Sequence, residues 1–330
     1  MVFAKVILWQ LTAGESWLHI EILAKFQEVL INIRDSIVNK IFLALPEPHG
    51  SLLSGILLGN RVRLDRDLLE IFRVVGLSHI IAVSGYNLTV MTANIRSALR
   101  PLLGRKITLI VAAVTVLSFV LLSGAPPSII RAAVMAGIVL FGEYIGRPNR
   151  SLGALVTAAG VIVFFEPKII FDVGFQLSIA ATYGLIRLAP VITNAFRNTK
   201  LPDWLKQVLG ETLAATVMTA PLIVAVFERL SILSPLTNIL VVPLIPLLMG
   251  VGITAVVLLF IFVPIGKIVA LLTWPILEWI IFISQKFSAW KFASTDVSLP
   301  AIVAILIMLG LFIGSEYLYS QYTRTKELAR

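Results

Sequence analysis

The sequence contains no cysteine and only three histidines among its 330 residues. The lack of cysteine excludes disulfides, thiolate zinc sites and cysteine nucleophiles, and three histidines argue against a dinuclear metal hydrolase with histidine ligands. The phosphate loop G-x-x-x-x-G-K-[ST], the zinc motif H-E-x-x-H and the nucleophile elbow G-x-S-x-G are absent as well. We therefore predict that the chain is not an enzyme, and we expect no catalytic residues, no metal site and no cofactor.

Charged residues are also scarce, at 14% of the chain, whereas soluble domains average about 25%. Hydrophobic residues make up 58% of the chain, and the mean hydropathy is +0.96. These values exclude a soluble enzyme and a disordered chain. They predict an all-α polytopic integral membrane protein, and the net charge of +9 is typical of basic cytoplasmic loops.

Amphipathic helices precede the long apolar segments. Apolar residues recur every three or four positions over 20–45, which predicts a helix that lies on the bilayer interface or packs on the membrane domain. Pro46 and Pro48 should end this helix. The apolar run 52–58 is too short to span a bilayer, which needs about 20 residues, so we predict a packed or re-entrant piece. A second short amphipathic helix is expected over 64–75.

About nine transmembrane helices are expected beyond residue 76. The seventh contains Pro243 and Pro246, and the first contains Ser84 and Gly85, so we predict that some of these helices are broken or kinked. The predicted spans are 77–95, 107–123, 127–146, 151–165, 170–191, 208–228, 236–263, 267–284 and 299–319.

The charges between the spans predict the orientation of the chain. Basic residues follow the odd-numbered spans, whereas most even-numbered connections are nearly neutral, although the connection after the eighth span fits this pattern poorly. The positive-inside rule then places the odd connections and the C-terminus in the cytoplasm. The connection after the first span is the most basic, with Arg96, Arg100, Arg105 and Lys106.

Polar side chains within the spans are candidates for a hydrated path, because a charge at mid-bilayer costs at least about 2.5–3.5 kcal/mol. Each also has a structural interpretation as an interhelical hydrogen-bond or ion-pair partner. Several of them lie on spans that we expect to be broken, which indicates a wet interior. The candidates that line this path are His79, Ser84, Gly85, Asn87, Arg131, Asp172, Gln176 and Asn238.

Five segments resemble the ComEC competence protein family. The clearest is 76–85, which reads GLSHIIAVSG, and the others are 51–61, 128–136, 172–180 and 238–243. Their order along the chain is the order in the family, and the resemblance extends over nearly the whole sequence. The family usually has a second histidine where this sequence has Asn87, so a role that needs a titratable imidazole does not carry over.

The resemblance implies a membrane channel that passes single-stranded DNA across the bacterial cytoplasmic membrane during natural transformation. It implies separate proteins as DNA receptor, nuclease and helicase-like ATPase, and a homodimer is one arrangement compatible with it. The expected domains are the remnant of an upstream extracellular OB-like domain (1–15), an amphipathic interfacial region (16–75), the transmembrane channel domain (76–320) and a cytoplasmic tail (321–330).

The resemblance also suggests roles for individual residues. Arg131 would contact phosphates, and Tyr86 and Phe175 are candidate surfaces for base stacking, which contributes about 1–3 kcal/mol per base. The basic residues after the first span would form the cytoplasmic exit for DNA. A permease for a small or amphipathic solute would need the same polar interior, and a truncated membrane scaffold that transports nothing is the third alternative.

Overall fold

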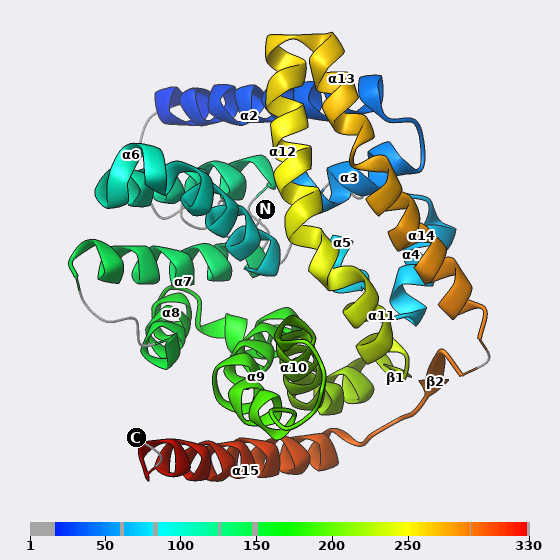
Figure 1. The fold of residues 1–330 in the computed structure, drawn as a ribbon. Helices are drawn as coiled ribbons and strands as arrows, with labels where there is room; N and C mark the ends of the chain where they lie inside the picture. Colours follow the sequence, from blue (N-terminus) through cyan, green and yellow to red (C-terminus); the bar gives the residue numbers. More distant parts are fainter. Residues whose placement is uncertain are drawn as a thin grey trace. The chain divides into compact units, whose positions relative to one another are not determined.

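The structure is a computed structural model that describes residues 17–59, 63–81, 85–124, 127–146, 151–290 and 292–328. The strand expected near the N-terminus, the predicted domain 1–15 and Ser84 lie outside these residues. Helices dominate the described part, as the composition predicts (Figure 1). Contacts group the chain into two compact units, each assembled from segments far apart in the sequence. The predicted order of domains along the sequence is a different kind of division and stays a prediction.

Unit 1 combines the described parts of 1–69, 78–148 and 244–281. Its centre is α3, whose ten residues are all buried and which contacts α2, α5, α6 and α12. The helices α12 and α13 form a hairpin, and α6 packs along α7 (Figure 1). The helices that belong to unit 1 or begin in it are α2 (Trp17–Ala44), α3 (His49–Leu58), α4 (Arg66–Val74), α5 (Ser78–Ile81), α6 (Gly85–Leu122), α7 (Pro127–Tyr144), α12 (Ile245–Ile261), α13 (Val263–Leu271) and α14 (Trp274–Ser288).

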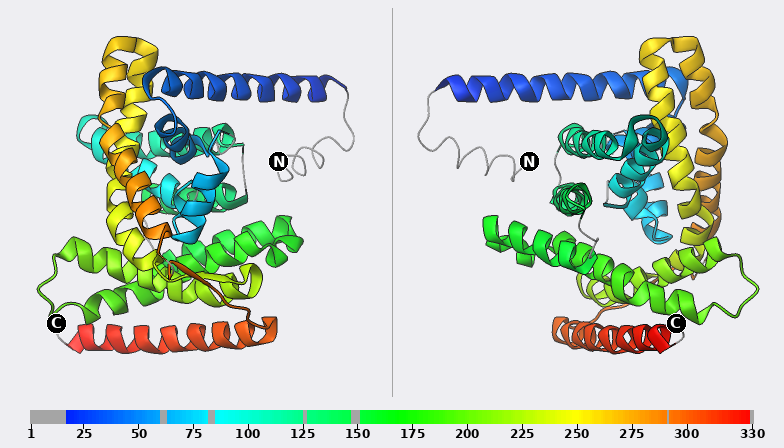
Figure 2. Two further views of the ribbon diagram at one scale, coloured as in Figure 1. Left: turned by 90° about the vertical axis from the view of Figure 1, so that its right-hand side faces the viewer. Right: turned by 60° about the vertical axis from the view of Figure 1, so that its left-hand side comes forward.

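Unit 2 combines residues 70–77, 149–243 and the described parts of 282–330. The helices α9 and α10 lie side by side, and α15 packs on both of them (Figure 2). Close packing of α9 on α10 depends on Gly184, because a Cβ there would lie 2.8 Å from the carbonyl oxygen of Ala214. The elements first met in this unit are α8 (Ser151–Phe165), η1 (Pro167–Phe171), α9 (Val173–Ala195), α10 (Asp203–Phe227), β1 (Arg229–Ser231), α11 (Ser234–Val241), η2 (Val242–Leu244), β2 (Ser294–Asp296) and α15 (Ala301–Leu328).

Strands β1 and β2 pair antiparallel, with Arg229 opposite Asp296 and Ser231 opposite Ser294. They are the only strands among the described residues, and they connect α10 to the chain that enters α15. This short ribbon does not change the fold class, which is that of an all-α membrane protein as predicted.

The expected number of nine spans is not confirmed. In the described part of the chain, six helical segments are long and apolar enough to cross a membrane: Gly85–Leu122, Val173–Ala195, Asp203–Phe227, Ser234–Ile261, Val263–Ser288 and Ala301–Glu327. The first of these joins the first two predicted spans. The connection that we expected between them is helical, and the helix is interrupted at Gly104, which has φ +69° and ψ 175°. The predicted fourth span is α8, an apolar helix of only 15 residues.

Several local expectations are confirmed. The amphipathic helix α2 ends at Ala44, two residues before the first of the two prolines. The run 52–58 lies within the wholly buried α3, which agrees with a packed piece rather than a span. The predicted break at Pro243 is present, since α11 ends at Val241 and a 3-10 turn precedes α12.

Candidate functional site

The start of α6 is the centre of the candidate site. The preceding helix α5 ends at Ile81 and α6 begins at Gly85. Asn87 is completely buried, and its side-chain Nδ2 donates hydrogen bonds to the carbonyl oxygens of Ile80 (3.3 Å) and Ile56 (3.2 Å). A short helix leaves carbonyls without intrahelical partners, and such groups need a donor when they are away from water. Asn87, on α6, therefore ties α5 to the buried α3.

Asn87 has no titratable imidazole, but these contacts give it a hydrogen-bonding role. His79 is exposed on α5, and Tyr86 is half-buried at the start of α6. Gly85 lies against α7, because a Cβ at this glycine would be 3.1 Å from the Cβ of Ala132. The first turn of α6 and the neighbourhood of Arg131 are thus brought together.

Arg131 is the one Lys, Arg, Asp or Glu side chain that is buried in the part of the chain that the structure describes, with 4% of its surface exposed. It lies on α7 next to Ala132, which adjoins Gly85 at the start of α6. Taking a charge out of water costs several kcal/mol before compensation. Arg131 lies in the predicted third span, and an ionisable residue at membrane depth is by default a functional candidate. The burial of its side chain makes Arg131 the strongest candidate among the described residues.

The segment that leads into this site is fixed within unit 2. The hydroxyl of Ser231 donates to the carbonyl oxygen of Val74, and that of Thr237 donates to the carbonyl oxygen of Val75, both at 2.8 Å. Gly76 has φ +75° and adjoins Ser234 so closely that a Cβ would lie 2.5 Å from that side chain. Residues 74–76 are therefore held against β1 and α11.

An ion network links α4 to both strands outside the membrane-spanning segments. The Arg229 guanidinium donates to Asp296 Oδ1 at 3.2 Å and to Glu70 Oε1 at 2.7 Å, and Glu70 also accepts from Arg73. The hydrogen bond to Asp296, followed by the one to Glu70, raises the pKa of Arg229. Arg229 thus stays charged and connects α4 with the strand pair.

The candidates in unit 2 have local partners. Asp172 caps α9, since its carboxylate accepts a hydrogen bond from the backbone N–H of Phe175 at 2.7 Å. Gln176 donates from Nε2 to the carbonyl oxygen of Ile170 at 2.8 Å, and Asn238 donates to Ser234 Oγ at 3.4 Å. Phe175 is buried in the unit, which leaves little of its ring for stacking. The path that these residues would share with those of unit 1 stays a prediction.

The basic residues that follow the first predicted span line a small cavity in unit 1. Its volume is about 160 Å³, and its lining comprises Arg96, Arg100, Arg105, Thr108 and Glu143. A guanidinium nitrogen of Arg96 lies 2.7 Å from the carboxylate of Glu143, and Arg105 donates to the backbone carbonyl of Glu143 at 2.7 Å. Lys106 is exposed and does not line the cavity. Three of the four basic residues thus meet at one place.

A polar cluster between α9 and α15 contains none of the predicted site residues. The Tyr183 hydroxyl donates to Glu316 at 2.7 Å, and the Arg187 Nε lies 3.0 Å from the same carboxylate oxygen. The Arg187 guanidinium also lies over the ring of Tyr319, 4.4 Å from its centre. An arginine and a glutamate inside two apolar spans were the available signal. Their distance of more than a hundred residues in sequence hid the pairing.

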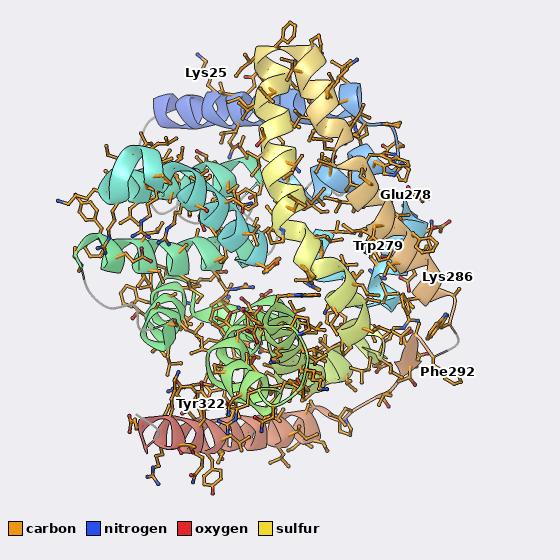
Figure 3. The ribbon with its side chains drawn as sticks, in the orientation of Figure 1. Lys25, Glu278, Trp279, Lys286, Phe292 and Tyr322 are labelled. Atoms are coloured by element: carbon orange, nitrogen blue, oxygen red, sulfur yellow. The ribbon has the colours of Figure 1, made fainter. Side chains whose placement is uncertain are left out.

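A second contact outside the predicted site residues joins α3 to α14. His49 is buried at the start of α3, and its Nε2 lies 2.7 Å from a carboxylate oxygen of Glu278, which Figure 3 labels on α14. The imidazole ring also lies 5.4 Å from the ring of Trp274. No group of three His, Cys, Asp or Glu side chains that could hold a metal ion occurs in the described ranges.

Replacement of Asn87 by alanine should lower the thermal stability of the purified protein. It removes two hydrogen bonds to buried carbonyls, and each unsatisfied group costs about 1–3 kcal/mol. Asn94→Ala is the matched control on the same helix, because Asn94 donates one hydrogen bond, to Pro246 O at 2.9 Å, from a half-buried position. Thermal unfolding in detergent should show a larger loss for Asn87→Ala. Equal losses of thermal stability in the two variants would contradict the role of Asn87 in joining α5 to α3.

Comparisons with known proteins give the family to which the sequence is related. The family model described as "Competence protein" matches residues 56–319. The ComE operon protein 3 of Bacillus subtilis (strain 168) is 28% identical over 219 residues, which cover 66% of this chain and 27% of that protein. No solved structure matches the chain. Since the family model covers well over half of the sequence, this multi-pass membrane chain belongs to the competence protein family and is of the ComEC type.

Proposed function

We propose that this chain forms the membrane passage through which single-stranded DNA crosses the bacterial cytoplasmic membrane during DNA uptake. The observation that carries the proposal is the family match, which extends over the start of α6, the buried Arg131 and the broken α11–α12 segment. The relative ComE operon protein 3 is named for a competence operon, and the chain spans 27% of its length. It is therefore part of the proposal that this chain shares the activity of the whole relative.

A polyanion cannot cross hydrocarbon, so such a passage needs water and polar groups at membrane depth. An interrupted helix places polar, non-helical backbone at membrane depth. Such backbone is tolerated in a membrane only where protein buries it or where it lines a wet cavity. Arg131 offers a guanidinium that can hold two phosphate oxygens at once. We propose Arg131 and His79 as the groups of unit 1 that meet the strand, with Tyr86 as a stacking surface.

The proposal assigns no chemical step to this chain. Strand degradation and energy supply would come from a separate nuclease and a helicase-like ATPase, and a separate receptor would deliver the DNA. The basic connections and the C-terminus would face the cytoplasm, in agreement with the positive-inside pattern of the sequence.

Deletion of the gene in a naturally transformable host tests the function. We expect that labelled DNA no longer enters a state protected from external nuclease, and that the wild-type gene restores this protection. Protection of the DNA is measured rather than transformants alone, so that a defect in recombination cannot imitate a defect in entry. Normal DNA entry in the deletion strain would contradict the proposal and favour a solute permease or a scaffold.

A further inference from the structure

The cavity beside the Gly104 interruption has a positively charged lining. Three guanidinium groups and one carboxylate line it, which gives a net charge of +2. Arg96 and Arg100 are four residues apart and therefore share a face of α6. The interruption at Gly104 turns the chain so that Arg105 joins them. The glycine thus brings together charges that an uninterrupted helix would spread around its surface.

Most of the hydrogen-bonding capacity of these arginines is available. Arg96 uses a nitrogen on the Glu143 carboxylate and Arg105 uses one on its backbone carbonyl, whereas a guanidinium has five N–H donors. Arg100 has an exposed side chain and makes no hydrogen bond or ion pair with the residues that the structure describes. Guanidinium groups match the oxygens of a phosphate in paired hydrogen bonds. The cavity therefore suits one phosphate group, with Glu143 as its internal competitor.

Exposed apolar side chains surround the charged lining of the cavity. Large apolar side chains flank the arginines and Glu143 in sequence and are exposed, with 78% of Leu102 and 64% of Phe141 accessible. A tyrosine, Tyr144, stands among them, and aromatic residues of this kind are enriched at the membrane interface. A polar strand in a wet channel would gain little from contact with these apolar side chains, whereas the acyl chains of a lipid would pack against them. The exposed apolar residues are Leu102, Leu103, Ile107, Phe141, Tyr144 and Ile145.

We propose that the cavity formed by Arg96, Arg100, Arg105 and Glu143 binds the phosphate headgroup of an anionic phospholipid, whose acyl chains lie along the exposed apolar side chains of α6 and α7. Basic pockets between membrane helices on the cytoplasmic side are a known form of lipid-headgroup site, and the sequence predicts this segment on that side. The surroundings favour a lipid over the DNA strand for which the sequence suggests an exit here. The proposal does not depend on DNA transport.

Native mass spectrometry of the purified full chain with short-chain phosphatidylglycerol tests the site. We expect wild type to bind phosphatidylglycerol more tightly than phosphatidylcholine of equal chain length. Arg100→Gln should weaken this binding about fivefold, as expected for one basic side chain near a lipid headgroup. Glu143→Gln should strengthen it, because the competing carboxylate is gone. Lys106→Gln is the matched control, which removes a neighbouring charge outside the cavity and should change nothing.

Two further probes separate the sources of the phosphate. Glycerol phosphate, which lacks acyl chains, should compete only weakly if the exposed apolar side chains contribute to binding, and a short poly-dT oligonucleotide should not compete. Equal binding of the two phospholipids would overturn the proposal, and so would equal effects of Arg100→Gln and Lys106→Gln. If the oligonucleotide displaces phosphatidylglycerol from wild type, the cavity belongs to DNA and the lipid proposal fails. If glycerol phosphate binds as tightly as phosphatidylglycerol, the site holds free phosphate and the lipid proposal fails as well.

Discussion

DNA uptake should fall steeply when Arg131 is replaced by alanine, while the protein still accumulates in the membrane. A hydrogen bond to a charged group contributes about 1.5–3 kcal/mol. If Arg131 holds a phosphate in the rate-limiting position of the passage, the loss corresponds to roughly 10- to 100-fold slower uptake. Entry of labelled DNA into nuclease-protected form, divided by the amount of membrane-inserted protein, measures this effect.

Two variants separate a path role of Arg131 from a structural role. Arg131→Lys keeps the positive charge but loses the paired donors, so uptake should be intermediate. Arg187→Ala removes an arginine from another membrane helix, where it pairs with Glu316. It should reduce the amount of protein without reducing uptake per molecule. If uptake per molecule falls equally in Arg131→Ala and Arg187→Ala, or stays normal in Arg131→Ala, Arg131 is not part of the path.

Signals carried by neighbouring residues predicted the local structure well. The apolar spacing in α2 and α4 follows the helical period, and the proline pairs mark where α2 ends and where α11 gives way to α12. Leu68 and Phe72 on α4, and Leu64 and Val75 just outside it, are the regularly spaced apolar residues of the predicted helix 64–75, and all four are buried. Each of these expectations depends on residues within one or two turns of each other.

Contacts between residues far apart in sequence could not be predicted from such local patterns. Asn87 was identified as polar and membrane-embedded, but its acceptor Ile56 O is 31 residues away and has no side-chain signal at all. The same applies to Tyr183 and Glu316, which are 133 residues apart. The basic residues of the segment 96–106 predict a loop between two spans, although arginine and leucine are good helix formers. Only Gly104 interrupts the helix there.

The turn that leads into the candidate site should be disrupted by Gly76→Val. Gly76 ends α4 in a Schellman motif, in which its own N–H bonds Arg73 O and the N–H of Leu77 bonds Phe72 O. Its φ of +75° costs a β-branched residue about 1–3 kcal/mol. A Cβ would also meet the Ser234 side chain at 2.5 Å, and overpacking of this kind adds about 1–3 kcal/mol. We expect a severe loss of thermal stability and of membrane-inserted protein.

The two penalties can be measured separately. Gly146 also has φ +75°, but no atom that the structure describes lies within 4 Å of a Cβ built there, so Gly146→Val reports backbone strain alone. Adding Ser234→Gly to Gly76→Val removes the two nearest atoms, whereas Ser231 Oγ stays 3.1 Å from the added Cβ. It should recover most of the packing part of the loss and bring the defect closer to that of Gly146→Val. If Gly76→Val unfolds at the same temperature as Gly146→Val, or if Ser234→Gly restores nothing, the contact between this turn and α11 does not contribute to the stability of the protein. Recovery by Ser234→Gly of both stability and DNA entry would show that the turn acts through its packing on α11, because a serine-to-glycine change elsewhere in a helix would only destabilise it.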